Sequence, residues 1–260
     1  MVSDEELLSV EEIIETGRMR EELAIARRIQ RAFLPEAPPD LQGFEIEGWN
    51  EPCRETGGDY YDYLRLPGGR LGVAIGDVSG HGIGPALLMA NARSALRALL
   101  QLAESPADVL GRLNDVLVPD MLEDHFMTMF VGVLDLSTKR FRYAVAGHER
   151  PLLLRANGDD FVTLDGKGMP LGIVPGLRYA EGDVVTLRHD DLLVCFTDGL
   201  WEATNHSGEM FGHDRMMAAL LRARALSAAD IVSVVRQEAS DFAEGAPQSD
   251  DLTLVALKVL

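Results

Sequence analysis

The stretch GGDYYDYLRLPGGRLGVAIGDV, residues 57–78, has an aspartate close to each of its ends. It contains two apolar segments, 59–66 and 70–78, separated by the turn sequence Pro67-Gly68-Gly69. This pattern predicts a β-hairpin. Because the strands of a hairpin are antiparallel, we expect the carboxylates of Asp59 and Asp77 to meet at the same end of a sheet.

Other aspartates also stand at the ends of apolar segments. Asp198 follows the segment 192–196, the pair Asp250-Asp251 precedes the segment 252–259, and Asp135 closes the run 130–134. One Gly-Asp pair is ordinary turn chemistry. Several carboxylates on rigid strand ends beside glycine are what hard cations such as Mg²⁺ or Mn²⁺ require. Four of these motifs therefore predict one metal site with Asp77 as the bridge between two ions, which favours a metal-dependent hydrolase.

The remainder of the chain alternates between strand and helix patterns. Helices are expected at 83–102, from Ser105-Pro106 onward, at 213–225 and at 228–243, where apolar residues recur at helical spacing. Strands are expected at 44–49, in a meander of 126–134, 140–146 and 151–155, in a second hairpin of 183–187 and 192–197, and at 252–259. This order predicts an α+β layered domain rather than a doubly wound parallel sheet.

An amphipathic helix is predicted before the first proline. Residues 1–34 contain no proline, and apolar residues recur every three or four positions at Met19, Leu23, Ala26, Ile29 and Phe33. Pro35 and the pair Pro38-Pro39 end the helix. We therefore expect a linker or regulatory helix at 1–35 and a catalytic domain at 36–260. The apolar stripe suits packing on that domain or a coiled coil in a homodimer, or the segment is a weakly ordered tail, and the sequence leaves all three open.

Composition limits the classes of partner. A formal net charge of −18 and a pI near 4.6 argue against binding to nucleic acid or to an anionic membrane. Two cysteines cannot form a disulfide framework, and Cys195 lies in an apolar run typical of a buried side chain. The sequence shows neither a membrane-spanning run nor a signal peptide. These features predict a cytoplasmic protein that acts on a protein partner or a compact substrate.

Taken in order, the motifs resemble those of a known enzyme family. The motifs are 57–62, 76–82, Phe126-Met127-Thr128, Ala146-Gly147-His148, 196–200 and 249–253. They are similar to the SpoIIE/RsbU branch of the PPM (PP2C-like) serine/threonine phosphatases, over about residues 20–260. The resemblance implies a β-sandwich of two antiparallel sheets flanked by helices (αββα), with two Mn²⁺ or Mg²⁺ ions at one edge. It also implies hydrolysis of phosphoserine or phosphothreonine on a STAS-domain anti-sigma-factor antagonist, in a bacterial partner-switching pathway that controls sigma factors during stress.

The resemblance assigns roles to the aspartates. Asp77 would bridge the two metal ions. Asp198 and Asp250 would complete the ligands of one ion, and Asp59 with the main-chain carbonyl of Val78 would serve the other. Asp251 either takes the place of Asp250 as a ligand or contacts the ligands without binding a metal ion itself. Arg54 stands at the spacing of a phosphate-binding arginine, with an exposed structural arginine as the other interpretation.

Other polar residues near these motifs receive no catalytic role. Some relatives have a histidine two residues after the bridging aspartate, where this chain has Ser79, and we interpret the nearby His81 as a residue of the helix start. His148 is expected to be structural, and Asp135 to belong to a strand-end turn. Asp62 is expected either to orient a water behind the metal ligands or to lie exposed on its strand.

Two other classes of protein share part of this pattern. The Gly57-Gly58-Asp59 sequence also occurs in nucleotide cyclases of the GGDEF type, but the Glu-Phe half of that motif is missing and the other aspartate motifs would be left unexplained. A catalytically weak, phosphatase-like binding or regulatory module would be marked by a missing metal-ligating aspartate. Because none is missing, the sequence favours an active phosphatase.

Overall fold

The computed structural model describes residues 4–102, 105–122 and 124–260, with side chains described from residue 15 onward. The helices are α1 (Asp4–Arg31), α2 (Ile83–Leu102), α3 (Pro106–Leu117), α4 (Asp198–Glu202), α5 (Gly212–Ala223) and α6 (Ala228–Ala243), with a 3₁₀ turn η1 (Val118–Asp120). The strands are β1 (Phe44–Glu51), β2 (Tyr60–Leu66), β3 (Arg70–Val78), β4 (Met127–Asp135), β5 (Arg140–Ala146), β6 (Leu152–Leu154), β7 (Phe161–Thr163), β8 (Val185–Thr186), β9 (Leu192–Phe196) and β10 (Leu252–Val259). In this described part, no helix is both long and apolar enough to span a membrane.

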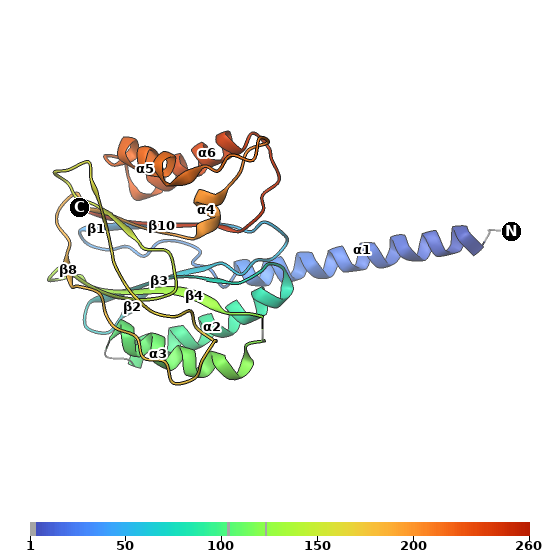
Figure 1. Cartoon of the computed structure of the whole chain (residues 1–260), viewed down its shortest axis with the longest axis horizontal. Helices are drawn as coiled ribbons and strands as arrows, with labels where there is room; N and C mark the ends of the chain where they lie inside the picture. Colours follow the sequence, from blue (N-terminus) through green and yellow to red (C-terminus); the bar gives the residue numbers. More distant parts are fainter. Residues whose placement is uncertain (1–3, 103–104, 123) are drawn as a thin grey trace.

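The strands form two sheets that pack face to face between two layers of helices. One sheet has the order β1-β10-β9-β6-β7 and the other has the order β2-β3-β4-β5-β8, and every strand pairing is antiparallel. Figure 1 shows α5 and α6 over the first sheet and α2 and α3 under the second. The predicted sandwich of two antiparallel sheets flanked by helices is confirmed.

Each interface between layers has its own apolar core. Alternation along the strands sends one set of side chains between the sheets, including Phe130, Phe141 and Tyr143, whose three rings pack against one another with centroids 5.8–6.2 Å apart. The opposite faces pack on the helices, for example Met89 of α2 under one sheet and Ile231 of α6 over the other. The sandwich is therefore held from both sides, and its strand ends are fixed in position.

The predicted hairpin of residues 59–78 is confirmed. Tyr60 pairs with Gly76 and Leu66 with Arg70, so the segment just before β2 and the end of β3 lie at one end of the sheet. The second predicted helix also begins as expected, because the Ser105 hydroxyl accepts a hydrogen bond from the Asp108 N–H at 3.1 Å.

Two predicted strand pairings are wrong. The segment 151–155 does not continue a meander with β5, because β6 pairs with β9 in the other sheet. Likewise β8 pairs with β5 whereas β9 pairs with β10, so these two strands do not form a hairpin. Between β5 and β6 the chain crosses from one sheet to the other at Gly147, whose φ of +66° turns the backbone sharply. Alternating apolar residues identify a strand but not the sheet that it joins.

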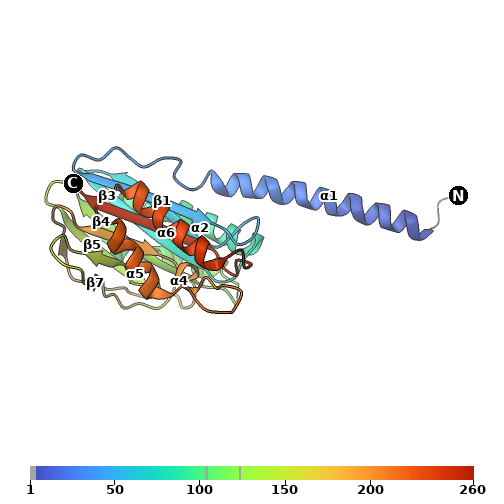
Figure 2. The same ribbon diagram turned by 90° about the horizontal axis from the view of Figure 1, so that it is seen from above.

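Helix α1 projects away from the sandwich, as Figures 1 and 2 show from two directions. Its apolar stripe is largely uncovered: the side chains of Met19 and Ile29 are 59% and 52% exposed. The last turn is different, because Gln30 is buried against the domain. Packing of the whole stripe on the domain, one of the three expected outcomes, is therefore not observed in the described side chains.

Candidate functional site

Four of the predicted aspartates lie at one edge of the sandwich. In the second sheet, Asp59 immediately precedes β2, and Asp77 is the penultimate residue of β3, directly opposite Thr128 on β4. In the first sheet, Asp198 begins α4 just after β9, and Asp250 stands just before β10. The N–H of Thr197 bonds to the carbonyl of Thr253 at 3.1 Å, which joins these two strand ends. Both sheets therefore deliver carboxylates to the same edge.

The carboxylate of Asp251 is fully engaged by the protein backbone. Its Oδ1 accepts from the N–H of Cys53 at 2.8 Å, and its Oδ2 accepts from the N–H groups of Gly58 at 2.8 Å and Asp59 at 3.3 Å. The residue is only 2% exposed. Asp251 therefore ties the loop that precedes β2 to the strand end of β10.

Asp250 has a different environment from its neighbour. It is half-buried, and its Oδ1 accepts a hydrogen bond from the N–H of Asp251 at 2.8 Å. Asp198 is similar, because it is half-buried and its Oδ1 accepts from the N–H of Gly199 at 2.9 Å. Each of these two carboxylates has one oxygen for which no hydrogen bond is observed among the described residues, which leaves it available to a ligand.

Asp59 is held by two threonine hydroxyls from the opposite sheet. Its Oδ2 accepts from Thr197 Oγ1 at 2.8 Å and from Thr253 Oγ1. The side chain is 3% exposed. Sequence reasoning missed both threonines. The available signal was that Thr253 lies two residues after Asp251 on a strand and Thr197 directly precedes Asp198, so the chain brings hydroxyls to the same edge as the carboxylates.

Burial and mutual repulsion raise the pKa values of these carboxyl groups. Burial, followed by the charges of Asp198, Asp250 and Asp251, raises the pKa of Asp77 to about 7, although a hydrogen bond with Asp59 acts in the opposite direction. Burial and then the charge of Asp77 raise the pKa of Asp59 well above its ordinary value. Burial and the charge of Asp198 also raise the pKa of Asp250. Such crowding of negative charge is relieved by a bound cation.

Glycine permits the close approach of the backbone at this edge. A Cβ atom on Gly58 would lie 2.3 Å from the carbonyl oxygen of Val78 and 3.2 Å from Asp77 Oδ1, so no side chain fits there. A Cβ atom on Gly199 would lie 2.2 Å from the carbonyl oxygen of Asp251. The Val78 carbonyl therefore lies in the same small space as the Asp77 carboxylate, as the Gly-Asp motifs suggested.

The donor set suits divalent cations in its chemistry. It consists of carboxylate oxygens and one main-chain carbonyl, which hard cations prefer. Among the described residues, however, no three His, Cys, Asp or Glu side chains are arranged as a ready-made metal cluster. The aspartates are near enough to shift one another's pKa values, and cations would have to draw them closer together.

Of the other residues that the sequence singled out, Arg54 and His81 are exposed, whereas Ser79 is held by a backbone hydrogen bond. Arg54 is exposed beside the loop that Asp251 holds, and no hydrogen bond or ion pair of its side chain is observed in the described structure. His81 is exposed just before α2, close enough to Asp250 for its charge to lower the pKa of that carboxyl group. Ser79 is structural, because its hydroxyl accepts from the N–H of Phe126 at 3.1 Å.

Asp62 and Asp135 lie outside this group of carboxylates. Asp62 is 1% exposed and forms an ion pair of 2.6 Å with Arg97 of α2, so the expectation that it lies exposed on its strand was wrong. It faces the helix layer because it is two residues from the buried Tyr60 on the same strand. Asp135 forms the expected strand-end turn, in which its Oδ1 accepts from the N–H of Thr138 at 2.8 Å.

His148 is buried between the two sheets. Its Nδ1 lies 2.8 Å from Thr128 Oγ1, and Thr128 is the residue opposite Asp77. Burial lowers the pKa of His148 to about 3, with a smaller opposite contribution from the backbone of Phe196. The imidazole is therefore neutral at neutral pH, and it lies between β4 of the second sheet and the end of β9 in the first sheet.

Comparison with solved structures defines the class of fold. The SiaA-PP2C domain of Pseudomonas aeruginosa superimposes with a TM-score of 0.82, and the alignment covers 95% of this chain and 99% of that chain at 21% sequence identity. The fold is therefore that of a PP2C domain.

Sequence comparison defines the family. Residues 67–260 match the family model described as Stage II sporulation protein E (SpoIIE). Protein IcfG of Synechocystis sp. is 30% identical over 272 residues, which cover 94% of this chain and 42% of IcfG. Phosphoserine phosphatase RsbU of Bacillus subtilis is 30% identical over 190 residues, which cover 73% of this chain and 56% of RsbU. The chain belongs to the SpoIIE family, as the motifs predicted, and it spans about half the length of these curated relatives.

Proposed function

We propose that this chain is a protein phosphatase that hydrolyses phosphoserine or phosphothreonine and depends on Mn²⁺ or Mg²⁺. The observation that supports this most strongly is the meeting of Asp59, Asp77, Asp198 and Asp250 at one edge, where burial and the neighbouring charges raise the pKa of Asp77 to about 7. The name of the relative RsbU, a phosphoserine phosphatase, supports the same reaction class.

In this proposal two cations bind among the carboxylates. Asp77 would be shared between them, Asp198 and Asp250 would hold one, and Asp59 with the Val78 carbonyl would hold the other. When bound, such cations neutralise phosphate charge and lower the pKa of a coordinated water toward neutrality. Between the two adjacent aspartates we choose Asp250 as the ligand, because Asp251 already accepts three backbone hydrogen bonds.

The protein contributes positioning in addition to ligands. The hydroxyls of Thr197 and Thr253 both donate to Oδ2 of Asp59 and so fix the orientation of this carboxylate. Asp251 fixes the loop on which Arg54 stands. We assign Arg54 the role of binding phosphate oxygens, since an exposed guanidinium without an observed partner can donate two parallel hydrogen bonds to them.

For the substrate we propose a phosphorylated STAS-domain anti-sigma-factor antagonist in a partner-switching pathway. The similarity to RsbU supports this assignment. We also propose that 1–35 forms a regulatory helix, that 36–260 forms the phosphatase domain, and that the exposed stripe of α1 pairs with a second copy of the chain. The exposure of Met19 and Ile29 supports pairing, because a single chain leaves these side chains in water.

The direct test is hydrolysis of p-nitrophenyl phosphate and of a phosphoserine peptide with Mn²⁺, with Mg²⁺ and with excess chelator. We expect turnover with either ion and loss of turnover with chelator. A panel of phosphorylated STAS proteins then identifies the protein substrate. Binding of a phosphorylated STAS protein without release of phosphate, under all metal conditions, would instead support the alternative of a catalytically weak regulatory module.

A further inference from the structure

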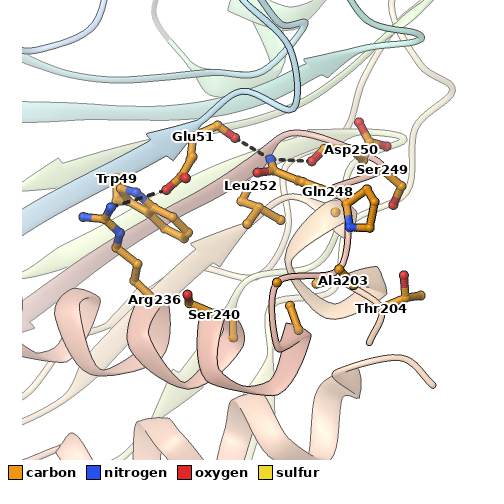
Figure 3. A pocket seen from close by; sticks show the side chains of 16 residues that line it. Trp49, Glu51, Ala203, Thr204, Arg236, Ser240, Gln248, Ser249, Asp250 and Leu252 are labelled. Atoms are coloured by element: carbon orange, nitrogen blue, oxygen red, sulfur yellow. Dashed lines mark hydrogen bonds and ion pairs between the residues drawn. The ribbon is translucent and has the colours of Figure 1, made fainter. Parts of the chain in front are cut away.

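A pocket of about 200 Å³ opens directly beside the candidate active site (Figure 3). Trp49 and Glu51 of β1 and Arg236 of α6 form one end of it, and Ser249 and Asp250 form the other. Helix α6 forms one wall through residues such as Ala239 and Ala243, and the segment after α4 contributes Ala203 and Thr204. The pocket therefore lies between the first sheet and the helix layer that covers it.

The pocket is built by specific interactions. The side-chain amide of Gln248 donates to the carbonyl oxygens of Glu51 at 2.9 Å and Asp250 at 2.7 Å, which fixes the loop before β10 against the end of β1 (Figure 3). The guanidinium of Arg236 lies 5.5 Å from the centre of the Trp49 ring and 3.5 Å from the Glu51 carboxylate. These contacts hold the walls in place before any ligand binds.

The walls combine apolar and polar surface. The apolar part comes from small or apolar side chains: Ala203, Ala239, Ala243, Ala246, Pro247 and Leu252. Trp49 adds a flat ring, and the one cation, Arg236, is already paired with Glu51. A pocket of this size is below the roughly 300–1,000 Å³ of sites that enclose whole small-molecule ligands. It suits a single apolar side chain.

The pocket shares residues with the candidate active site. Asp250, a proposed metal ligand, and Gly199, the residue after Asp198, both line it. A phosphoserine that reaches the proposed cation site at Asp198 and Asp250 therefore has its neighbouring residues close to the pocket opening, because an extended chain advances only about 3.3 Å per residue.

We propose that this pocket is a specificity subsite, which receives one apolar side chain of the phosphoprotein substrate close in sequence to the phosphorylated residue. The proposal rests on the phosphatase function proposed above and adds a determinant of which phosphoproteins are hydrolysed. Trp49 and the alanines of α6 supply the apolar contact, and Gln248 holds the loop that closes the pocket.

The test uses phosphoserine peptides that differ at one flanking position at a time, where leucine replaces alanine. We expect one position at which leucine raises kcat/KM by about 10-fold or more, the usual value of filling an apolar pocket. In Ser240→Phe, a bulky ring is placed on the α6 wall, and the leucine-to-alanine ratio should fall toward one. Because the ratio compares two substrates of one enzyme, it is independent of changes in overall turnover.

Ser233→Phe is the matched control, since Ser233 is exposed on the same helix two turns earlier and does not line the pocket. It should keep the wild-type ratio. Ala243→Leu fills the pocket from the end of α6 and serves if Ser240→Phe does not fold. A wild-type protein that hydrolyses all peptides equally, or a ratio that survives in a folded filled variant, overturns the subsite but leaves the phosphatase proposal intact. Hydrolysis of none of the peptides overturns both.

Discussion

The carboxylates at the candidate site form two layers, which differ in their burial and in the hydrogen bonds that they accept. In the buried layer, Asp59 and Asp251 are 3% and 2% exposed and accept hydrogen bonds from threonine hydroxyls or backbone N–H groups. In the rim, Asp77, Asp198 and Asp250 are half-buried, and within the described part of the chain Asp198 and Asp250 each accept a hydrogen bond only from the N–H of the next residue. The protein thus already satisfies both oxygens of Asp251 and one oxygen of Asp59, whereas the carboxylates of the rim still need counter-charges.

Position in the sequence does not determine the role of a carboxylate at this site. Asp250 and Asp251 are adjacent, yet one belongs to the rim and the other to the buried layer. A carboxylate whose oxygens are occupied by protein donors has little capacity left for a cation, and one with an open oxygen has more. Substitutions in the rim should therefore affect catalysis, and substitutions in the buried layer should affect folding as well.

The largest effect is expected in the rim. Asp77→Asn removes the bridging anion and should lower phosphatase turnover by more than about 100-fold, because even residues that only orient metal ligands contribute 10- to 100-fold. In chelator the variant should unfold at a temperature no lower than wild type, since it removes a repelled charge. Steady-state kinetics and thermal unfolding measure both effects. Asp135→Asn, at the far end of its strand, is the control, and normal Mn²⁺-dependent turnover by Asp77→Asn would contradict the assignment.

The adjacent aspartates provide the next test. Asp251→Asn places an amide donor against backbone N–H groups and should lower the free energy of unfolding by about 1–3 kcal/mol. Asp250→Asn should lower turnover and leave the stability close to that of wild type, because its side chain accepts one hydrogen bond. Urea unfolding in chelator and kinetics in saturating Mn²⁺ separate the two effects. If Asp250→Asn is the unstable variant and Asp251→Asn only the inactive one, the layers have been assigned the wrong way round.

A smaller effect is expected from the hydroxyls that link the layers. Thr253→Val keeps the shape of the side chain but removes a donor to Asp59, so the concentration of Mn²⁺ required for half-maximal activity should rise by about 10-fold or more. Isothermal titration of Mn²⁺ gives an independent measure of the affinity. Thr186→Val, on β8 in the other sheet, is the control. An unchanged Mn²⁺ affinity in Thr253→Val would mean that Asp59 needs no orientation.

The smallest effect concerns pH. The pKa of His148 is about 3 in the folded protein and near 6.5 when exposed, so the unfolded state binds the proton more readily below pH 6.5. Stability is therefore lost as the pH falls below 6.5. Between pH 6.5 and 5 this group accounts for about 2 kcal/mol, at about 1.4 kcal/mol per pH unit.

His148→Asn should remove that part of the pH dependence. Urea unfolding at pH 7 and pH 5 should show a smaller loss of stability for the variant than for wild type. His189→Asn is the control, because the His189 ring is 74% exposed. Parallel pH dependences for wild type and His148→Asn would show that the histidine between the two sheets is protonated without cost.

Much of the architecture follows from the sequence because its signals are local. Turn glycines and alternating apolar residues located the 59–78 hairpin, and an N-cap serine located the start of α3. The sheet to which β6 belongs depends on contacts far away in sequence, and no local pattern encodes it. The convergence of Asp59 and Asp77 followed from hairpin register. The different environments of Asp250 and Asp251 arise from N–H groups of Cys53 and Gly58, almost two hundred residues earlier in the chain.

The buried Gln30 at the end of α1 bears on how the molecule can be divided. Its amide nitrogen donates to the Gly57 carbonyl at 2.6 Å, and its amide oxygen accepts from the Gly57 N–H at 3.1 Å, two residues before Asp59. A fragment that starts at residue 36 would leave both the N–H and the carbonyl of Gly57 without this partner. The last turn of α1 therefore belongs to the same folded unit as the loop that contains Gly57. A working fragment has to start at least one turn before Gln30.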